Sequence, residues 1–364
     1  MLLRSCLIFV VLGGAERTAC AELKLLQDVQ KSGARCMDGT PAGYYFSGNT
    51  SSHQWIIDLE GGGECASKEA CSPKVLTALG SSKYFKKEIG FGFIARGPRF
   101  QTFNRVFVPY CSQDLWTGQR RTATNETFSF FFSGHLILDA ILTDLERVGG
   151  LNEASDIILT GESAGGIGVW PNLDWLAARY SNAVVTGAPI AGFYFWADPY
   201  TGPGHTSSAL VDFRETAWPS HVALWQSFVD ADCAAAIEPW RCVLANNTYP
   251  FITSPHFIIE AQSDKVVLGA HDWVPTSQAP HWSAPVVAYL KEWAHNMSIA
   301  LSPAMAASSP NGVFSPACFI HTGFTQERPI IRGMTYIEAF SAWYLDNKTV
   351  KLQDTCGVMC GQCP

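Results

Sequence analysis

Residues 156–166 read DIILTGESAGG and join a strand-like run to a glycine-rich turn. Asp156–Thr160 is apolar and strand-forming, residues 161–165 carry the G-x-S-x-G pattern, and a helix is expected from about Gly165 to Tyr180. A strand, a sharp turn and a helix form a nucleophile elbow, in which small residues let strand and helix pack closely while the serine hydroxyl stands clear of the backbone. We therefore predict that Ser163 is a catalytic nucleophile; the alternative is a glycine-rich turn that happens to contain a serine.

The rest of the chain alternates strand-like and helical patterns. Apolar runs predict buried strands at residues 53–60, 104–110, 183–186 and 257–261, and apolar residues at helical spacing predict a helix over Gly134–Val148. This rhythm is typical of an α/β fold with a mainly parallel sheet and helices on both faces. We expect one catalytic domain over residues 22–364, with a cap-like insertion at about 197–250 that acts either as a lid or only as a stabilising cover.

Composition and the N-terminus indicate an exported protein. The chain has 364 residues, 47% hydrophobic and 16% charged, and a net charge of -7, so it can bury a large core and no nucleic-acid partner is expected. Residues 1–21 resemble a secretory signal, with Arg4, an apolar run over Cys6–Leu12 and a small-residue cleavage site ending at Ala21. A signal anchor is the alternative. No other segment is long and apolar enough to span a membrane, and we expect a secreted, extracellular monomer.

The number of cysteines also indicates that the protein is exported. Cleavage after Ala21 would remove Cys6 and Cys20 from the twelve cysteines and leave ten, which predicts five disulfides. Only two local pairs are predicted from spacing, Cys65–Cys71 and Cys233–Cys242.

Two further sequence patterns are also typical of an exported protein. The C-terminal cysteines lack a histidine pair, so we expect disulfides there and no metal site: Cys356, Cys360 and Cys363. Five N-x-S/T sequons are compatible with glycosylation: Asn49, Asn125, Asn246, Asn296 and Asn347.

A nucleophilic serine needs a base and a group that orients the base, in the chain order serine, acid, histidine. Asp264 directly follows the apolar run 257–261, at a strand end where ligands of parallel sheets gather, so it is the predicted acid. Asp272, in a loop eight residues on, is its rival. Four histidines follow the acid: His271, His281, His295 and His321. His321 is the predicted base because nearby Cys318 could hold its loop in place; an ordinary loop histidine is the alternative.

Acyl transfer also needs N–H donors for the oxyanion. Leu59–Cys65 reads LEGGGEC and follows the first strong strand, the position of the oxyanion loop in serine hydrolases of this kind. Gly62 and Gly63 are the predicted donors, together with the N–H of Ala164. A phosphate-binding loop would need a following Lys-Ser/Thr, which is absent, and a plain tight turn is the remaining alternative.

Several segments in this order resemble the notum/pectin acetylesterase family of secreted serine hydrolases: LEGGGEC (59–65), NRVFVPYC (104–111) with SQDLWTG (112–118), LTGESAGGIG (159–168) and CFIH (318–321). The resemblance covers roughly residues 35–345. It implies an α/β-hydrolase fold, a Ser163-Asp264-His321 triad and an oxyanion hole of Gly62, Gly63 and Ala164, without metal or organic cofactor.

The resemblance leaves two substrate classes. Some members remove acetyl groups from plant cell-wall polysaccharide, and notum-like members remove a long acyl chain from a secreted signalling protein. Glu64 departs from the family, which usually has an aromatic residue there, so the mouth of the site is expected to be more polar. Glu64, Phe193 and Trp116 are candidate substrate-binding residues. The whole aromatic run 193–196 (FYFW) could line an acyl pocket, with a core position as the alternative. We expect O-acetyl esters of a polysaccharide as substrates; the alternatives are a long-chain deacylase and an inactive binding module.

Overall fold

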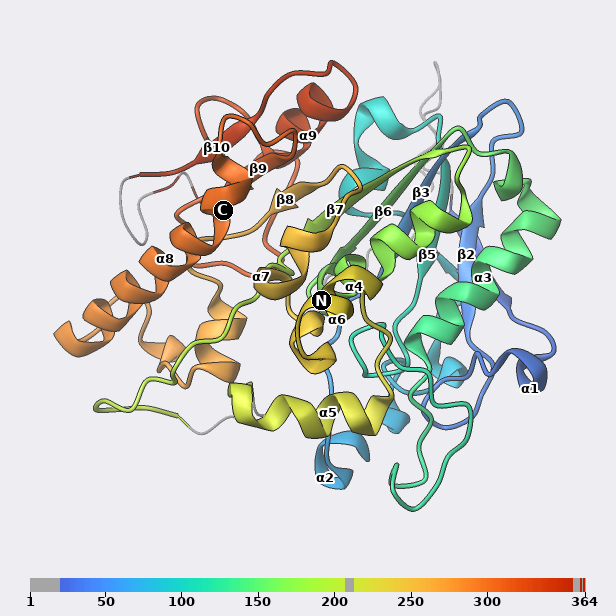
Figure 1. Cartoon of the computed structure of the whole chain (residues 1–364), viewed down its shortest axis with the longest axis horizontal. Helices are drawn as coiled ribbons and strands as arrows, with labels where there is room; N and C mark the ends of the chain where they lie inside the picture. Colours follow the sequence, from blue (N-terminus) through green and yellow to red (C-terminus); the bar gives the residue numbers. More distant parts are fainter. Residues whose placement is uncertain (1–19, 207–212, 356–360, 362, 364) are drawn as a thin grey trace, which may run out of the picture.

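The computed structural model describes residues 20–206 and 213–355, together with residues 361 and 363. At its centre lies a ten-stranded sheet in the order β10-β9-β8-β7-β6-β3-β5-β2-β1-β4 (Figure 1). The strands are β1 (Ala21–Leu25), β2 (Gly43–Ser47), β3 (Gln54–Leu59), β4 (Glu88–Ile89), β5 (Asn104–Val108), β6 (Asp156–Glu162), β7 (Val184–Ile190), β8 (Phe257–Ile259), β9 (Gly312–Ser315) and β10 (Lys351–Gln353). Pairing is parallel from β5 through β3 to β10, and antiparallel among β5, β2, β1 and β4. The predicted mainly parallel α/β fold is confirmed.

Helices cover both faces of this sheet. They are α1 (Val29–Ser32), α2 (Lys68–Cys71), α3 (Gly134–Gly149), α4 (Ala164–Arg179), α5 (Trp218–Trp225), α6 (Ala231–Ala236), α7 (Ala245–Thr248), α8 (Ala284–Met305) and α9 (Tyr336–Tyr344). Successive side chains of a strand point to opposite faces. Ile57 of β3 therefore joins a core with α3, α4 and α8, whereas Ile56 joins a second core with α9. Two apolar layers sandwich the sheet, which is why its central strands read as almost continuous apolar runs.

The parallel strands bring distant segments to one edge. β3, β6, β8 and β9 run in the same direction, so the loops that follow them all begin at the same edge of the sheet. These loops carry Gly62, Ser163, Asp264 and His321. The order of strands thus gathers residues that are up to 259 positions apart, from 62 to 321, at one place.

Four disulfides lie among the described residues: Cys36–Cys111, Cys65–Cys71, Cys233–Cys242 and Cys318–Cys363. The two predicted local pairs are therefore confirmed, whereas Cys356 and Cys360 lie outside the described residues.

One feature of the N-terminal region differs from the sequence prediction. Cys20 is also disulfide-bonded, although the count of ten cysteines left it out of the disulfide set. The exclusion of Cys20 from the disulfide set is wrong for this structure, because Cys20 was left out only on the basis of the assumed cleavage site. Ala21 is buried and begins β1, so cleavage after Ala21 would remove both the bonded cysteine and a residue of the sheet. The signal peptide itself stays a prediction.

The region predicted as an insertion consists of short helices. Between residues 197 and 250 the structure has α5, α6, α7 and short 3-10 turns, and residues 207–212 lie outside the description. Trp225 of α5 donates its Nε1–H to the carbonyl of Cys65 at 3.0 Å, so this helix packs against the loop after β3. The segment therefore lies close to the edge of the sheet that gathers the four loops. Its role as lid or cap stays a prediction.

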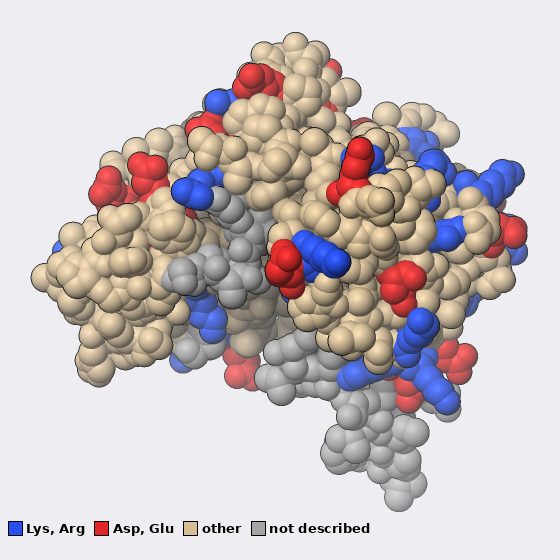
Figure 2. Space-filling view, turned by 90° about the horizontal axis from the view of Figure 1, so that it is seen from below, with Lys and Arg blue, Asp and Glu red and all other residues tan. Residues whose placement is uncertain are grey.

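Two observations concern the surface. Within the described residues, none of the helices has the length and apolar composition that crossing a membrane requires. Figure 2 shows one face of the molecule, on which basic and acidic side chains are interspersed. This mixture agrees with the nearly balanced totals of 25 basic and 32 acidic residues.

Candidate active site

The turn between β6 and α4 has the geometry of a nucleophile elbow. Ser163 has φ 57° and ψ -122°, a strained conformation for a residue with a side chain, and it caps the N-terminus of α4. The neighbouring glycines are required by close packing. A Cβ on Gly165 would lie 1.9 Å from the carbonyl oxygen of Leu59, and one on Gly61 would lie 2.3 Å from that of Glu162. The elbow and the loop after β3 are thus pressed together, backbone against backbone.

His321 is held by an acid from the neighbouring loop. Its Nδ1 lies 2.6 Å from Oδ2 of Asp264, whose other oxygen accepts the backbone N–H groups of Val266 at 2.8 Å and Val267 at 3.1 Å. Asp264 is fully buried and His321 is 8% exposed. The carboxylate therefore has a fixed orientation, and its second oxygen is directed at the imidazole.

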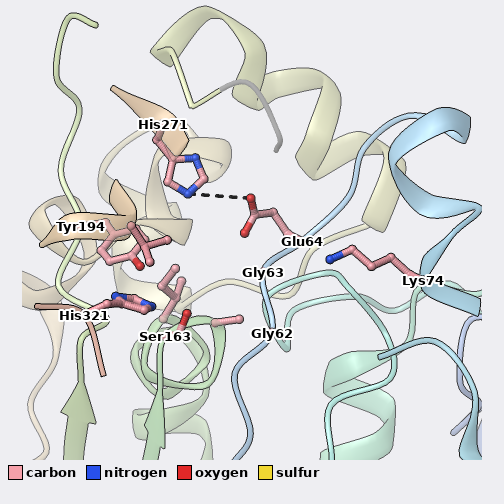
Figure 3. A pocket seen from close by; sticks show the side chains of 11 residues that line it. Gly62, Gly63, Glu64, Lys74, Ser163, Tyr194, His271 and His321 are labelled. Carbon is pink, nitrogen blue, oxygen red and sulfur yellow. Dashed lines mark ion pairs between the residues drawn. The ribbon is translucent and has the colours of Figure 1, made fainter. Parts of the chain in front are cut away.

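The loop that carries His321 is held at two points. Cys318 forms a disulfide with Cys363, and the N–H of Lys265 donates to the carbonyl of Ile320 at 3.2 Å, which joins the loop to the one that carries Asp264. Ser163 and His321 line the same cavity, which has a volume of about 270 Å³, and Figure 3 shows the imidazole pointing toward the Ser163 side chain. The imidazole of His321 therefore lies between the side chain of Ser163 and the carboxylate of Asp264.

The loop after β3 lies on the other side of the serine. Gly62 and Gly63 have φ values of 156° and 75°, and both line the cavity with Ala164. In the described part of the chain, no oxygen accepts the N–H of these three residues. The loop is supported from behind, since Trp116 Nε1 donates to Glu60 O at 3.0 Å and Gln113 Nε2 donates to Gly62 O at 3.3 Å. The backbone N–H groups of this loop thus lie at the same cavity as Ser163.

Comparison with known proteins agrees with this geometry. The family model described as Pectinacetylesterase matches residues 15–364. The chain belongs to the pectinacetylesterase family. It is accordingly a carboxylic ester hydrolase with the α/β-hydrolase fold.

Individual relatives of this pectinacetylesterase-family chain come from plants and animals. Pectin acetylesterase 5 of Arabidopsis thaliana is 29% identical over 359 residues, which cover 92% of this chain and 82% of that protein. Palmitoleoyl-protein carboxylesterase notum1a of Danio rerio is 29% identical over 331 residues, which cover 84% of this chain but only 63% of that protein. The solved structure of the Wnt deacylase Notum from Drosophila superposes with a TM-score of 0.80 at 25% identity, covering 95% of this chain and all of that one.

The alternative acid and two of the alternative bases, His281 and His295, do not line the cavity in this pectinacetylesterase fold, whereas the third, His271, does. Asp272 accepts the Nε1–H of Trp293 at 2.7 Å, and burial raises its pKa to about 8. His281 and His295 are exposed, on a loop and on α8. Among the candidates that the sequence left open, Asp264 and His321 are therefore the pair in mutual contact.

The substrate-binding candidates divide into one residue at the cavity and two in the core. Glu64 lines the cavity. Phe193 is fully buried and packs its ring against Tyr249 at 5.3 Å, and Trp116 is fully buried behind the oxyanion loop. Neither of the two lines the cavity, so their proposed contact with substrate is not supported. The segment after β7 presents Tyr194 to the cavity instead of Phe193.

Three further polar residues line the cavity: Lys74, Tyr194 and His271. Burial lowers the pKa of Lys74, and the nearby carboxylate of Glu64 opposes this shift. His271 Nε2 lies 4.0 Å from Oε1 of Glu64. Tyr194 belongs to the aromatic run 193–196, for which the sequence left an acyl pocket and a core position open. The sequence offered His271 only as a possible base, and no local pattern distinguishes Lys74.

Two buried carboxyl groups, Asp58 and Glu60, lie at the carboxyl end of β3. Burial raises the pKa of Asp58 on β3 to about 7, with a further contribution from the charge of Glu60. Burial also raises the pKa of Glu60 to about 7, although its carboxylate accepts the N–H of Tyr110 at 2.9 Å. Neither oxygen of Asp58 has a hydrogen-bond partner among the described residues. The pKa of each of these groups therefore lies near neutral pH in the folded protein, well above the ordinary value of a carboxyl group.

Proposed function

We propose that this carboxylesterase is a secreted serine esterase in which Ser163 is the nucleophile, His321 the base and Asp264 the orienting acid. The observation that carries the proposal is the 2.6 Å contact of His321 Nδ1 with Asp264 Oδ2, together with an imidazole directed at Ser163. Secretion is supported by the four disulfides of the described residues, since such bonds persist in oxidising compartments.

The reaction has two halves. Nε2 of His321 takes the proton of Ser163, whose Oγ attacks the ester carbonyl, and the N–H groups of Gly62, Gly63 and Ala164 bind the negatively charged oxygen. The tetrahedral intermediate collapses, and His321 returns the proton to the departing alcohol. Water then attacks the acyl-enzyme with the same base and releases the acid and free Ser163. Asp264 keeps the Nδ1 proton of His321 in place during both halves.

The preferred substrate is an O-acetyl ester of a polysaccharide. A relative named pectin acetylesterase aligns over most of both chains, and the cavity of about 270 Å³ has the polar side chains of Glu64, Lys74 and His271 in its lining. The similarity to the Drosophila Wnt deacylase favours a second candidate, removal of a long acyl chain from a secreted protein. The two candidate substrates differ in acyl length. An octanoyl chain has six methylenes more than an acetyl group, and burying all six would improve the binding free energy by about 5 kcal/mol, at about 0.8 kcal/mol each.

Two experiments test the proposal. Labelling with a serine-directed fluorophosphonate and turnover of 4-nitrophenyl acetate should both be lost in Ser163→Ala, while secretion and melting temperature are kept. His321→Ala should lose several orders of magnitude in kcat, and the exposed His281→Ala is the matched control with normal kcat. Near-normal turnover in purified Ser163→Ala would exclude this nucleophile, and a folded wild-type protein without labelling or turnover would support an inactive binding module.

Acyl length is tested separately with 4-nitrophenyl acetate, butyrate and octanoate. An acetylesterase should lose kcat/KM beyond butyrate, whereas a series that rises through octanoate would favour the long-chain deacylase.

A further inference from the structure

The catalytic groups are divided between two halves of the sheet. Ser163 follows β6, which pairs with β7 along its whole length, whereas Asp264 and His321 follow β8 and β9. The halves meet where β7 lies beside β8 (Figure 1). Among the described residues, this ladder has a single residue pair, Ile190 with Ile259, besides an isolated bridge nearer the opposite edge. The spacing of the nucleophile from its base therefore depends on a joint with few strand contacts.

Glu260 lies at this joint and reaches across it. The residue directly follows β8, and its side chain is fully buried. Its Oε2 accepts the backbone N–H of Phe193 at 2.8 Å, and its Oε1 accepts that of Ala261 at 3.1 Å. Because Phe193 belongs to the turn after β7, one buried carboxyl group joins the end of β8 to the neighbouring loop.

The turn after β7 is itself fixed to the nucleophile elbow. The backbone N–H of Ser163 donates to the carbonyl of Ile190 at 3.0 Å. Trp170 on α4 donates its Nε1–H to the carbonyl of Gly192 at 3.1 Å. A Cβ on Gly192 would lie 2.3 Å from the carbonyl carbon of Gly166, so the turn packs backbone against backbone on the start of α4. A displacement of this turn would therefore displace the elbow as well.

On the other side of the joint, Glu260 belongs to the segment that carries the acid. Asp264 follows it by four residues, and the backbone N–H of Glu260 donates to the carbonyl of Phe314 in β9 at 3.1 Å. The loop after β9 carries His321, whose Nδ1 lies 2.6 Å from Asp264 Oδ2. The acid and the base therefore belong to one half, and the Glu260 carboxyl group joins that half to the elbow.

We propose that Glu260 is a positioning residue for the reaction, because its carboxyl group holds the acid and the base in register with the nucleophile across the joint between β7 and β8. This inference rests on the proposed function, since it takes Ser163, Asp264 and His321 as the catalytic groups. Glu260 does not line the cavity, so it acts only through the spacing of the groups that do. A misplacement of about 1 Å between reacting groups can lower the rate by about a hundredfold.

Two near-isosteric variants separate the hydrogen bond from the bulk of the side chain. Glu260→Met fills the same space with only a weak acceptor, whereas the amide oxygen of Glu260→Gln can still accept the N–H of Phe193. Burial and the charge of Asp264 raise the pKa of Glu260 well above its usual value, so a neutral amide is a close substitute. On 4-nitrophenyl acetate, kcat per fluorophosphonate-labelled site should fall about tenfold to a hundredfold in Glu260→Met, with KM changed less than about threefold. In Glu260→Gln, kcat should stay within about threefold of wild type.

Asp174→Leu is the matched control, because Asp174 joins the same two halves near the opposite edge of the sheet. From α4 it accepts the backbone N–H of Thr253 at 2.7 Å and that of Ser254 at 3.0 Å, just before β8. Its loss should lower the melting temperature but leave kcat per labelled site unchanged. The control therefore separates a weaker joint in general from a lost alignment at the active site.

The outcomes separate this inference from the proposed function. A folded Glu260→Met enzyme with wild-type kcat would overturn the inference, as would a Glu260→Gln enzyme as slow as Glu260→Met or an equal loss of kcat in Asp174→Leu, although Ser163 would remain the nucleophile. If Glu260→Met does not fold, Glu260→Asp decides, because its carboxyl group is one methylene too short to reach Phe193 from the same backbone. An unchanged kcat in Glu260→Asp would then overturn the inference. Turnover in Ser163→Ala would instead refute the proposed function.

Discussion

Replacing Asp264 with asparagine should inactivate the enzyme by changing the tautomer of His321. Oδ1 of Asp264 accepts two backbone N–H groups, from Val266 at 2.8 Å and Val267 at 3.1 Å, while Oδ2 lies 2.6 Å from His321 Nδ1. In Asp264→Asn the amide oxygen will take the Oδ1 position, because only an oxygen can accept both N–H groups. The amide nitrogen then faces His321 and, as a donor, requires an unprotonated Nδ1. The proton moves to Nε2, which can no longer accept the proton of Ser163.

The size of the effect follows from the same contacts. Reversing the amide would restore the productive tautomer, but it would break two backbone hydrogen bonds and bury their donors unpaired, at about 1–3 kcal/mol each. The imidazolium that forms during attack also loses its carboxylate partner. Together these losses correspond to a fall in kcat of about 10³–10⁴-fold, or roughly 4–5.5 kcal/mol. Folding should be nearly unaffected, because the substitution is isosteric.

The assay is kcat on 4-nitrophenyl acetate at pH 7, with melting temperature as the check on folding. Asp272→Asn is the matched control. Burial raises the pKa of Asp272 to about 8, so its carboxyl is mostly protonated at this pH, and an amide oxygen can still accept the N–H of Trp293. Its kcat should stay within about threefold of wild type. A folded Asp264→Asn enzyme with more than a tenth of the wild-type kcat, or an inactive Asp272→Asn enzyme beside an active Asp264→Asn one, would refute the reasoning.

Two further predictions concern stability. Gly165→Ala places a Cβ 1.9 Å from the carbonyl oxygen of Leu59, where only backbone could move, so it should lower the free energy of unfolding by on the order of 3–5 kcal/mol. Gly90→Ala is the control, because its Cβ meets nothing within 4 Å, and it should leave the free energy of unfolding nearly unchanged. Equal melting temperatures for the two variants would contradict the close packing at Gly165. In the folded protein the pKa of Asp58 is raised to about 7, compared with about 3.9 in the unfolded chain. The contribution of Asp58 to the free energy of unfolding is therefore fully present below a pH of about 3.9 and is lost as the pH rises to about 7. The melting temperature should therefore fall over this range, and fall less steeply in Asp58→Asn; parallel curves for the two proteins would show that Asp58 keeps an ordinary pKa.

The sequence by itself was enough to predict the elbow and the glycine-rich loop after the first strong strand. Both are local structures: a serine with positive φ between glycines, and a glycine run after an apolar strand, follow from steric rules that act over a few residues. The observed β6 and α4 agree with the predicted strand and helix, and Ser163 has φ 57°. The parallel sheet could also be predicted, because apolar runs that alternate with helical patterns can bury both faces only in that arrangement.

Tertiary structure alone decided which acid contacts which histidine. The sequence favoured Asp264 from its place after a strand but left Asp272 open, and both are buried; the structure shows that Asp264 contacts His321 and that Asp272 accepts the N–H of Trp293. That choice depends on the distance between the ends of β8 and β9, which pair side by side although they are more than fifty residues apart in sequence.

Structure likewise decided which side chains surround the cavity. After β7 the sequence offers adjacent aromatic residues, and only the path of the chain shows that Tyr194 faces the cavity while Phe193 packs in the core. The pairing of Glu64 with His271 joins two loops that are 207 residues apart, from 64 to 271. A sequence records which residue types are present, but whether two of them meet depends on how strands are ordered in the sheet and on which side each loop leaves it, and these are properties of the packed whole.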